Sequence, residues 1–495
     1  MPNGASAQAP AQAGTMPGVT EQFLHRGSLY AMAVLGAVAI ASFWVMSVDL
    51  RWIYLMSYLW FGLVYGILLQ YGRFCMASAV RDLWSVKVPR MAVGVLIAIV
   101  LYSLTAAAVT AAGVSPFHPH PMGWHILIGA AIFGFGIVFA GGCASGSLYK
   151  AGEGNGGSWL VLLAISFVQA WFVATGTWTQ GLVPEAWTAS AVDKGMPAQL
   201  SVTEGWFDQF MAGYIWDLSG TNVAAMLGME GTLAGAFVAN ALLGAILPSA
   251  VLILVLYFAY FRKGFLRRQG WTPGQAGLGG EAQGVWAMLT SSRKTALAGL
   301  GLGVFAGMQM WVVGGMRQKF DIFNFGELLG RMGYDQGLSM QRTVFDPGYW
   351  YITTQEAQLG GWVMKGLGAD YMDNIFFGLE HGLPNPLVNA PLLMSIGIIL
   401  GAAMIALVNR EFKLKRPNLE SAVFALLGGT LMGIGARVAL GCNIGAFFAT
   451  ATNGDPTGWI FLAGMAVGSY AAVKIMNWWL ERRAAKEMDL ELDDL

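Results

Sequence analysis

Three cysteines are the residues of this sequence best suited to chemistry, and each lies near glycine. Cys75 belongs to the segment GRFCMASAVRDLW, Cys143 to GGCASGSLYKAGEG, and Cys442 to LGCNIGAFFATATNG. A thiol is a weak hydrogen-bond donor with a polarizable sulfur, so it can contact a sulfur-bearing anion without holding it tightly. Three such groups in series would pass an anion along a pore, because weak sequential sites favour release.

Other kinds of chemistry find no support among the polar residues. The cysteines are odd in number without a CxxC pair, and the five histidines show no metal-ligand spacing, so no disulfide framework or metal centre is expected. No Ser-His arrangement points to hydrolysis, and no Walker-type lysine motif accompanies the glycines. We therefore predict no enzyme activity and no cofactor. The 28 basic and 28 acidic residues form no basic stripe, which excludes nucleic acid as a partner.

The elements that must position the cysteines are membrane helices in a lipid bilayer. Hydrophobic residues make up 56% of the 495 residues and charged residues only 11%, a composition typical of an integral membrane protein. A hydrocarbon core about 30 Å thick needs about 20 apolar residues, at about 1.5 Å per residue. Ten segments meet this need approximately, and they are residues 29–48, 52–71, 91–112, 124–140, 159–178, 232–261, 295–313, 390–408, 421–440 and 457–479.

The basic loops indicate the orientation, because lysine and arginine in short loops stay on the cytoplasmic side. Such loops contain Arg81, residues 262–268 and residues 410–416, so both termini are predicted to be cytoplasmic. The segment that ends at Phe261 contains Pro248, and it is either one kinked helix or a re-entrant piece followed by a crossing.

Seven regions follow from these segments and loops. They are a flexible cytoplasmic tail (1–28), an extra first helix (29–51), a first membrane repeat (52–178), an external loop (179–231), a connecting helix with a cytoplasmic loop (232–294), a second membrane repeat (295–480) with an external insertion (315–388), and a cytoplasmic tail (481–495).

An internal repeat relates two of the cysteines. Residues 128–147 read IGAAIFGFGIVFAGGCASGS and residues 427–446 read LGGTLMGIGARVALGCNIGA, and they align without gaps at one offset, 442 − 143 = 299. By the loop charges the first segment runs inward and the second outward, and such inverted repeats recur in transporters. We predict an all-α polytopic membrane protein of about ten transmembrane helices in two inverted repeats, with re-entrant or broken helices at the cysteine motifs.

The glycine-rich breaks around the cysteines are the best candidates for a substrate path. Irregular backbone at membrane depth is expected only where it lines a cavity, and free N–H groups at a helix N-terminus suit an anion. Arg437 precedes Cys442 within an apolar run, where it is either a substrate contact or half of a structural pair. A lone cysteine in a membrane helix is commonly a packing residue, but here all three fall at breaks. The candidate substrate-binding residues are Cys75, Cys143, Cys442, Gly142, Ser145, Gly146, Ser147, Gly441, Asn443, Gly445 and Arg437.

At these residues the sequence resembles the YeeE/YedE sulfur-transport family, which includes thiosulfate uptake transporters. The resemblance lies in GRFCMASAVRDLW, GFGIVFAGGCASGSLYKAGEG and GIGARVALGCNIGAFF, and the repeated layout extends it over residues 52–479. It implies that Cys75, Cys143 and Cys442 contact thiosulfate along an hourglass-shaped path in the bacterial inner membrane, through S–H hydrogen bonds. It also implies a cytoplasmic TusA-like sulfur-carrier protein as partner.

Two departures from the family leave room for another substrate, such as a different reduced sulfur or selenium species. The outer loops are long, and the second repeat lacks a counterpart of Cys75, with Met316 or Asn374 nearest by crude offset.

Other functions remain as alternatives. A membrane-bound thiol relay would form persulfide or disulfide intermediates, and a structural subunit of a respiratory complex would move no substrate.

Import of an anion into the cell also requires a source of free energy. A dianion that enters against an inside-negative potential costs about 4 to 5 kcal/mol per 100 mV, at about 2.3 kcal/mol per charge. Cotransported protons or rapid consumption of the substrate inside the cell would offset this cost.

Overall fold

The computed structural model describes residues 26–114, 120–174, 213–217, 222–272, 274–320, 350, 352–368, 386 and 389–493. This part of the chain is almost entirely helical; a short pairing joins β1 (Met122–Gly123) to β2 (Ile215–Asp217), and an isolated bridge joins Asn155 to Lys415. The predicted all-α polytopic fold is confirmed. The tail at residues 1–25, most of the loop 179–231 and most of the insertion 315–388 lie outside the described residues.

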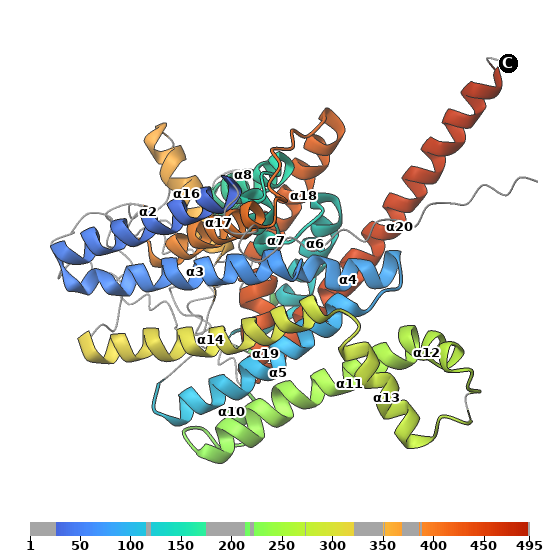
Figure 1. Cartoon of the computed structure of the whole chain (residues 1–495), viewed down its shortest axis with the longest axis horizontal. Helices are drawn as coiled ribbons and strands as arrows, with labels where there is room; N and C mark the ends of the chain where they lie inside the picture. The colour runs from blue at the N-terminus through green and yellow to red at the C-terminus, as the bar shows by residue number, and fades with distance from the viewer. Residues whose placement is uncertain are drawn as a thin grey trace, which may run out of the picture.

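The helices follow the predicted segments closely (Figure 1). In the first half of the chain they are α2 (Arg26–Val48), η1 (Leu50–Trp52), α3 (Ile53–Tyr71), α4 (Met76–Ser85), α5 (Arg90–Ala111), α6 (Trp124–Ala140), α7 (Ala144–Gly152) and α8 (Gly156–Ala174). In the second half they are α10 (Val223–Met226), η4 (Gly235–Ile246), α11 (Leu247–Leu256), η5 (Tyr257–Phe261), α12 (Arg262–Gln269), α13 (Gly277–Leu289), α14 (Arg293–Phe320), α16 (Thr353–Gly366), α17 (Ala390–Val408), α18 (Leu419–Val438), η7 (Asn443–Ala449), α19 (Thr450–Thr452) and α20 (Pro456–Asp493).

Nine helical segments of the described residues are long and apolar enough to cross a membrane. The sequence predicts ten crossings, and the difference lies at α8, whose apolar part at Gly156–Phe172 is shorter than the other nine. The stretch around Pro248 is one continuous helical segment from Gly235 to Gln269, as in the first of the two alternatives. Proline is tolerated there because Pro248 lies in the first turn of α11, directly after the π-helical η4.

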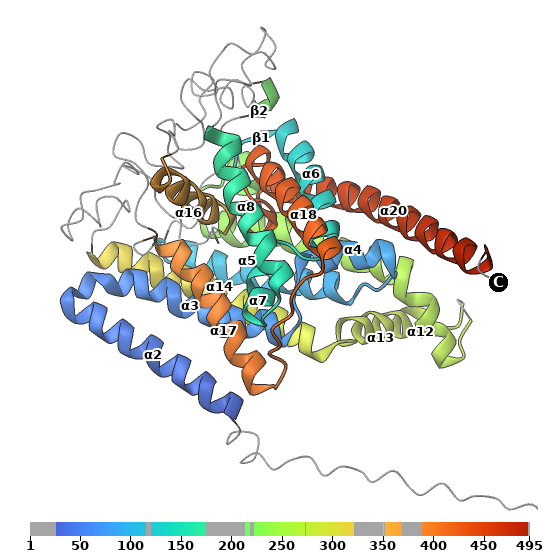
Figure 2. The same ribbon diagram turned by 90° about the horizontal axis from the view of Figure 1, so that it is seen from above.

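The two halves of the chain interlock by exchanging helices. Helix α3 packs against α17, and α14 packs against α5, while α6 packs against α20 and α18 packs against α8. Figure 2 shows α8 beside α18 and α3 close to α17. If α3 corresponds to α14, α5 to α17, α6 to α18 and α8 to α20, each of these pairs maps onto another pair. Equivalent segments of two repeats are expected to pack in this reciprocal way.

Helices α6 and α18 cross each other at the repeated glycines. A methyl group on Gly129 would lie 2.4 Å from the Ala439 nitrogen, and one on Gly428 would lie 2.3 Å from the Ala140 nitrogen. The offset of 299 pairs Gly129 with Gly428 and Ala140 with Ala439, so each contact is the counterpart of the other. Only glycine permits this approach, which brings the two cysteine-bearing breaks into the centre of the bundle.

Candidate functional site

Each cysteine immediately precedes a helix. Cys75 is the N-cap residue of α4, Cys143 that of α7 and Cys442 that of η7, and all three have extended backbone conformations. All three thiols are free and buried. Because α6 ends at Ala140 and α18 ends at Val438, both glycine-rich segments interrupt helices as predicted. The first backbone N–H groups of a helix lack intrahelical acceptors and carry partial positive charge, so these positions suit an anion.

The inner cysteine pair consists of Cys75 and Cys143. Their sulfur atoms lie 3.8 Å apart, although the residues come from different breaks. The Ser145 hydroxyl lies 3.4 Å from the Cys143 sulfur, and the backbone N–H of Gly146 donates to that sulfur over the same distance. The inner pair thus places two polarizable sulfur atoms beside two neutral hydrogen-bond donors, the Ser145 hydroxyl and the Gly146 N–H.

Glycine is required at position 146 because the Cys75 thiol fills the space beside it. A methyl group there would lie 2.6 Å from the Cys75 sulfur and 3.3 Å from the Cys143 sulfur.

Ser147 is buried near Gly142, and the Lys150 ammonium group reaches the same turn, where it donates to the Gly141 carbonyl over 2.6 Å. Lys150 is therefore the cation of the inner site, and it is absent from the predicted residues.

An ion-pair network holds the turn that follows α7. Arg73 bonds Glu153 over 3.2 Å and Glu411 over 2.8 Å, and the Gln70 amide donates to Glu411 over 2.6 Å. Partial burial raises the pKa of Glu153, while the Arg73 charge opposes this rise. The network thus connects the segment before Cys75, the turn after α7 and the loop that contains Glu411.

The Cys442 site has a different set of neighbours. Backbone groups of Gly445, Ile444 and Thr353 lie close to the Cys442 thiol, so the start of α16 lies against this break. The buried Arg437 guanidinium donates to the Thr354 hydroxyl over 2.9 Å. The sequence leaves two roles open for Arg437, a structural pair and a substrate contact; the bond to Thr354 is of the first kind, and Arg437 also lies close enough to Cys442 for their charges to interact.

Free space adjoins Cys442. A methyl group on Gly445 would meet no atom within 4 Å, whereas one on Gly441 would lie about 3.0 Å from Ala446. The Asn443 side chain is fully buried, and its amide has no hydrogen-bond partner among the described residues. An unsatisfied buried amide beside free space is an arrangement that a polar ligand would complete.

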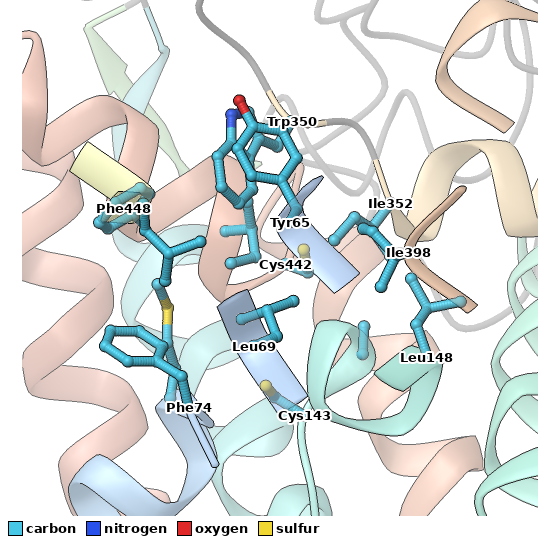
Figure 3. Close-up of a cluster of buried hydrophobic side chains, with 14 of the residues drawn as sticks. Tyr65, Leu69, Phe74, Cys143, Leu148, Trp350, Ile352, Ile398, Cys442 and Phe448 are labelled. Carbon is cyan, nitrogen blue, oxygen red and sulfur yellow. The ribbon is translucent and has the colours of Figure 1, made fainter. Parts of the chain in front are cut away.

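Aromatic side chains close the Cys442 site on one side. The rings of Tyr65 and Trp350 have centroids 3.9 Å apart, and Trp350 also lies 5.8 Å from Phe448. Figure 3 shows Leu69 between the sulfur atoms of Cys442 and Cys143, with Tyr65 and Trp350 beyond Cys442. The three thiols thus form two groups separated by a buried leucine.

The predicted residues therefore gather in two places. Gly142, Ser145, Gly146 and Ser147 surround Cys143, and Cys75 joins them. A second group contains Cys442 with Gly441, Asn443, Gly445 and Arg437. Within the described ranges, no three His, Cys, Asp or Glu side chains come together in a manner that would hold a metal ion.

Known proteins match this chain over most of its length. A family model described as sulphur transport matches residues 71–471. The thiosulfate transporter TsuA of Spirochaeta thermophila is 27% identical over 424 residues, which cover 85% of this chain and 98% of that protein. The TsuA of Escherichia coli is 26% identical over 412 residues, covering 83% and 91%. The probable transporter YedE of Escherichia coli is 31% identical over 123 residues, or 25% of this chain and 31% of that protein.

The family match spans all three cysteines and both glycine-rich breaks. The family and these relatives are transporters rather than enzymes, as the sequence predicts. With its apolar helices, this chain is a multi-pass membrane protein that belongs to the sulphur-transport family.

Proposed function

We propose that the protein imports thiosulfate or a similar small reduced-sulfur anion across the bacterial inner membrane, along a path contacted by Cys442, Cys75 and Cys143. One observation carries this proposal: all three thiols of the chain are buried N-cap residues in the interior of the bundle, at the breaks between its helices. The names of the TsuA relatives support thiosulfate as the substrate.

The physical basis of the proposal is weak but repeated stabilisation of negative charge. Each thiol and the N–H groups that follow it offer donors, and each group of thiols has one cation nearby, Lys150 or Arg437. A dianion in the membrane interior needs such donors because water is scarce there, and in a low dielectric an unpaired charge is costly. Leu69 separates the two groups, so its movement would permit passage between them.

Direction and partner are further parts of the proposal. The basic loops support an orientation in which the Cys143 side faces the cytoplasm, by the positive-inside rule. An inverted repeat is supported by the reciprocal contacts of Gly129 and Gly428. A TusA-like sulfur carrier would then receive the imported sulfur on the cytoplasmic side.

Uptake of radiolabelled thiosulfate into liposomes that contain the purified protein tests the proposal. We expect Cys75→Ala, Cys143→Ala and Cys442→Ala each to reduce uptake by about 10- to 100-fold. A hydrogen bond to a charged group contributes about 1.5 to 3 kcal/mol, and about 1.4 kcal/mol corresponds to a factor of ten. Cys→Ser variants, which keep a donor, should retain more uptake. Wild-type liposomes without uptake, or three alanine variants as active as the wild type, would contradict the proposal.

A second candidate function is sulfur transfer between the thiols of the inner pair, and their separation of 3.8 Å favours it. Such a relay requires a persulfide during turnover, formed when one thiolate attacks the outer sulfur of thiosulfate and sulfite leaves, after which the second thiolate takes the outer sulfur and releases the first. Mass spectrometry of the protein after incubation with thiosulfate separates the two functions. Uptake with unmodified cysteines supports transport by non-covalent contact, whereas a persulfide that forms at the rate of uptake supports the relay.

A further inference from the structure

Three buried polar side chains belong to the two elements that meet at the Cys442 thiol. Gln355 and Glu356 belong to the first turn of α16, and Asn443 is the first residue of η7. Their exposed fractions are 0%, 4% and 0%. Neither amide group and neither oxygen of the carboxyl has a hydrogen-bond partner among the described residues. Buried polar groups in folded proteins nearly always have partners, so three exceptions together indicate a ligand.

The three side chains are brought to Cys442 by two elements. The backbone of Thr353 contacts the Cys442 thiol, and Thr354 accepts from Arg437, so the first turn of α16 lies across the break that Asn443 begins. The free space beside Gly445 lies in the same turn as Asn443. The first turn of α16, the start of η7 and the end of α18 therefore meet at the Cys442 thiol, beside free space.

Few charged groups face Glu356. Glu356 interacts electrostatically with Cys442, and the Arg437 guanidinium on α18 reaches Thr354 in the same turn of α16. The helices α8 and α17, which pack against α16, contain no acidic or basic residue. A carboxylate in this position would lack a hydrogen bond and would repel an incoming anion, whereas the neutral acid would offer an O–H donor to it.

We propose that the Cys442 site is a proton-linked oxyanion subsite, in which Gln355, Asn443 and Arg437 bind the oxygens of the anion and Glu356 takes part in its protonated form. This inference rests on the proposed function and specifies how that function depends on protons. The expected ligand is a small tetrahedral sulfur oxyanion, whose terminal sulfur contacts Cys442.

The protonated form is favoured by the surroundings of Glu356. Burial raises the pKa of the Glu356 carboxyl well above its ordinary value. Below this raised pKa the acid is neutral and the anion binds, and above it each anion must bring a proton from the outer solution. Binding therefore weakens as pH rises through the pKa. A proton that accompanies a dianion halves the charge that must move against the membrane potential.

The pH dependence of thiosulfate uptake by the full-length protein in liposomes tests this subsite. Wild-type uptake should fall by about tenfold per pH unit above the pKa of Glu356, the slope for one proton. Glu356→Gln, which keeps the shape and cannot ionise, should give uptake that does not change with pH. The matched control is Glu420→Gln, because Glu420 is an exposed partner of Arg483 and its loss should leave the wild-type profile.

Calorimetry provides a second readout that does not require flux. Thiosulfate binding to purified wild-type protein in buffers of different ionisation enthalpy should show uptake of about one proton above the pKa, and none for Glu356→Gln. Gln355→Leu should weaken binding but keep the proton uptake. If Glu356→Gln takes up thiosulfate with the same pH profile as the wild type, the subsite is overturned. If the wild type takes up no thiosulfate at any pH, the proposed function itself is overturned.

Discussion

The Cys143 and Cys442 sites share a backbone motif but differ in what fills it. Cys143 and Cys442 occupy equivalent positions, and both precede a short helix. Beside Cys143, the glycine at 146 is covered by the thiol of Cys75. Beside Cys442, the equivalent Gly445 meets free space. The duplicated motif thus produces one closed site rich in sulfur and one open site rich in amide groups.

The difference originates in the helix that faces each break. Helix α4 packs against α5 and α20, and α16 packs against α17 and α8, so the two helices occupy corresponding places under the helix equivalences. Cys75 precedes α4, while Ile352 precedes α16. The counterpart of Cys75 by position is therefore Ile352, not Met316, which lies within α14. Asn374, the other residue suggested by offset, lies outside the described residues.

The largest difference between the Cys143 and Cys442 sites should appear in their response to an oxidant. A membrane-permeant oxidant should join Cys75 to Cys143, because sulfurs 3.8 Å apart need only a small movement to reach the disulfide length of about 2.0 Å. The cross-link should abolish uptake in the oxidised fraction, and a reductant should restore it. The measurement is uptake together with the mass of the linked peptides. Cys442→Ser should form the same cross-link, whereas Cys75→Ser should be insensitive, and a Cys442-containing disulfide would contradict the geometry.

Alanine at the two equivalent glycines gives the next largest contrast. Gly146→Ala should displace the Cys75 thiol, at a cost of about 1 to 3 kcal/mol for overpacking, and so reduce uptake by about 10- to 100-fold. Gly445→Ala should leave the Tm of the protein close to that of the wild type, because its methyl group meets free space and displaces no side chain. Thermal unfolding in detergent compares the stability of the two variants, and uptake rates measure the loss at Gly146. Equal losses of stability would mean that the two sites are packed equally tightly.

Much of this architecture could be predicted from residue patterns. Long apolar runs predict the helices because lipid permits no unsatisfied backbone, and glycine clusters predict the breaks at Cys143 and Cys442 for the same reason. One offset was sufficient to relate the two breaks, since both repeats keep the glycines that let α6 and α18 cross.

The contacts between distant segments could not be predicted in this way. Cys75 and Cys143 are separated by 68 positions, and no periodic pattern links them. Gln355 and Glu356 stand in a polar insertion that is typical of an external loop, and only its packing against the bundle buries them. Lys150 could have been identified as a site residue from the sequence, because it is the only cation of the Cys143 motif and lies on the helix that Cys143 begins.

The smallest contrast concerns the turns that follow the two short helices. Asp455 accepts hydrogen bonds from the backbone and hydroxyl of Thr457 over 2.9 and 2.7 Å, and thereby caps α20. Asp455→Ala should reduce stability by about 1 kcal/mol, the usual cost of a lost N-cap. Glu153→Ala should cost less, because its partner Arg73 is 56% exposed and exposed ion pairs contribute little. Thermal unfolding of both variants in detergent measures the difference, and a larger loss for Glu153→Ala would mean that the ion-pair network, rather than the helix cap, holds its turn more firmly.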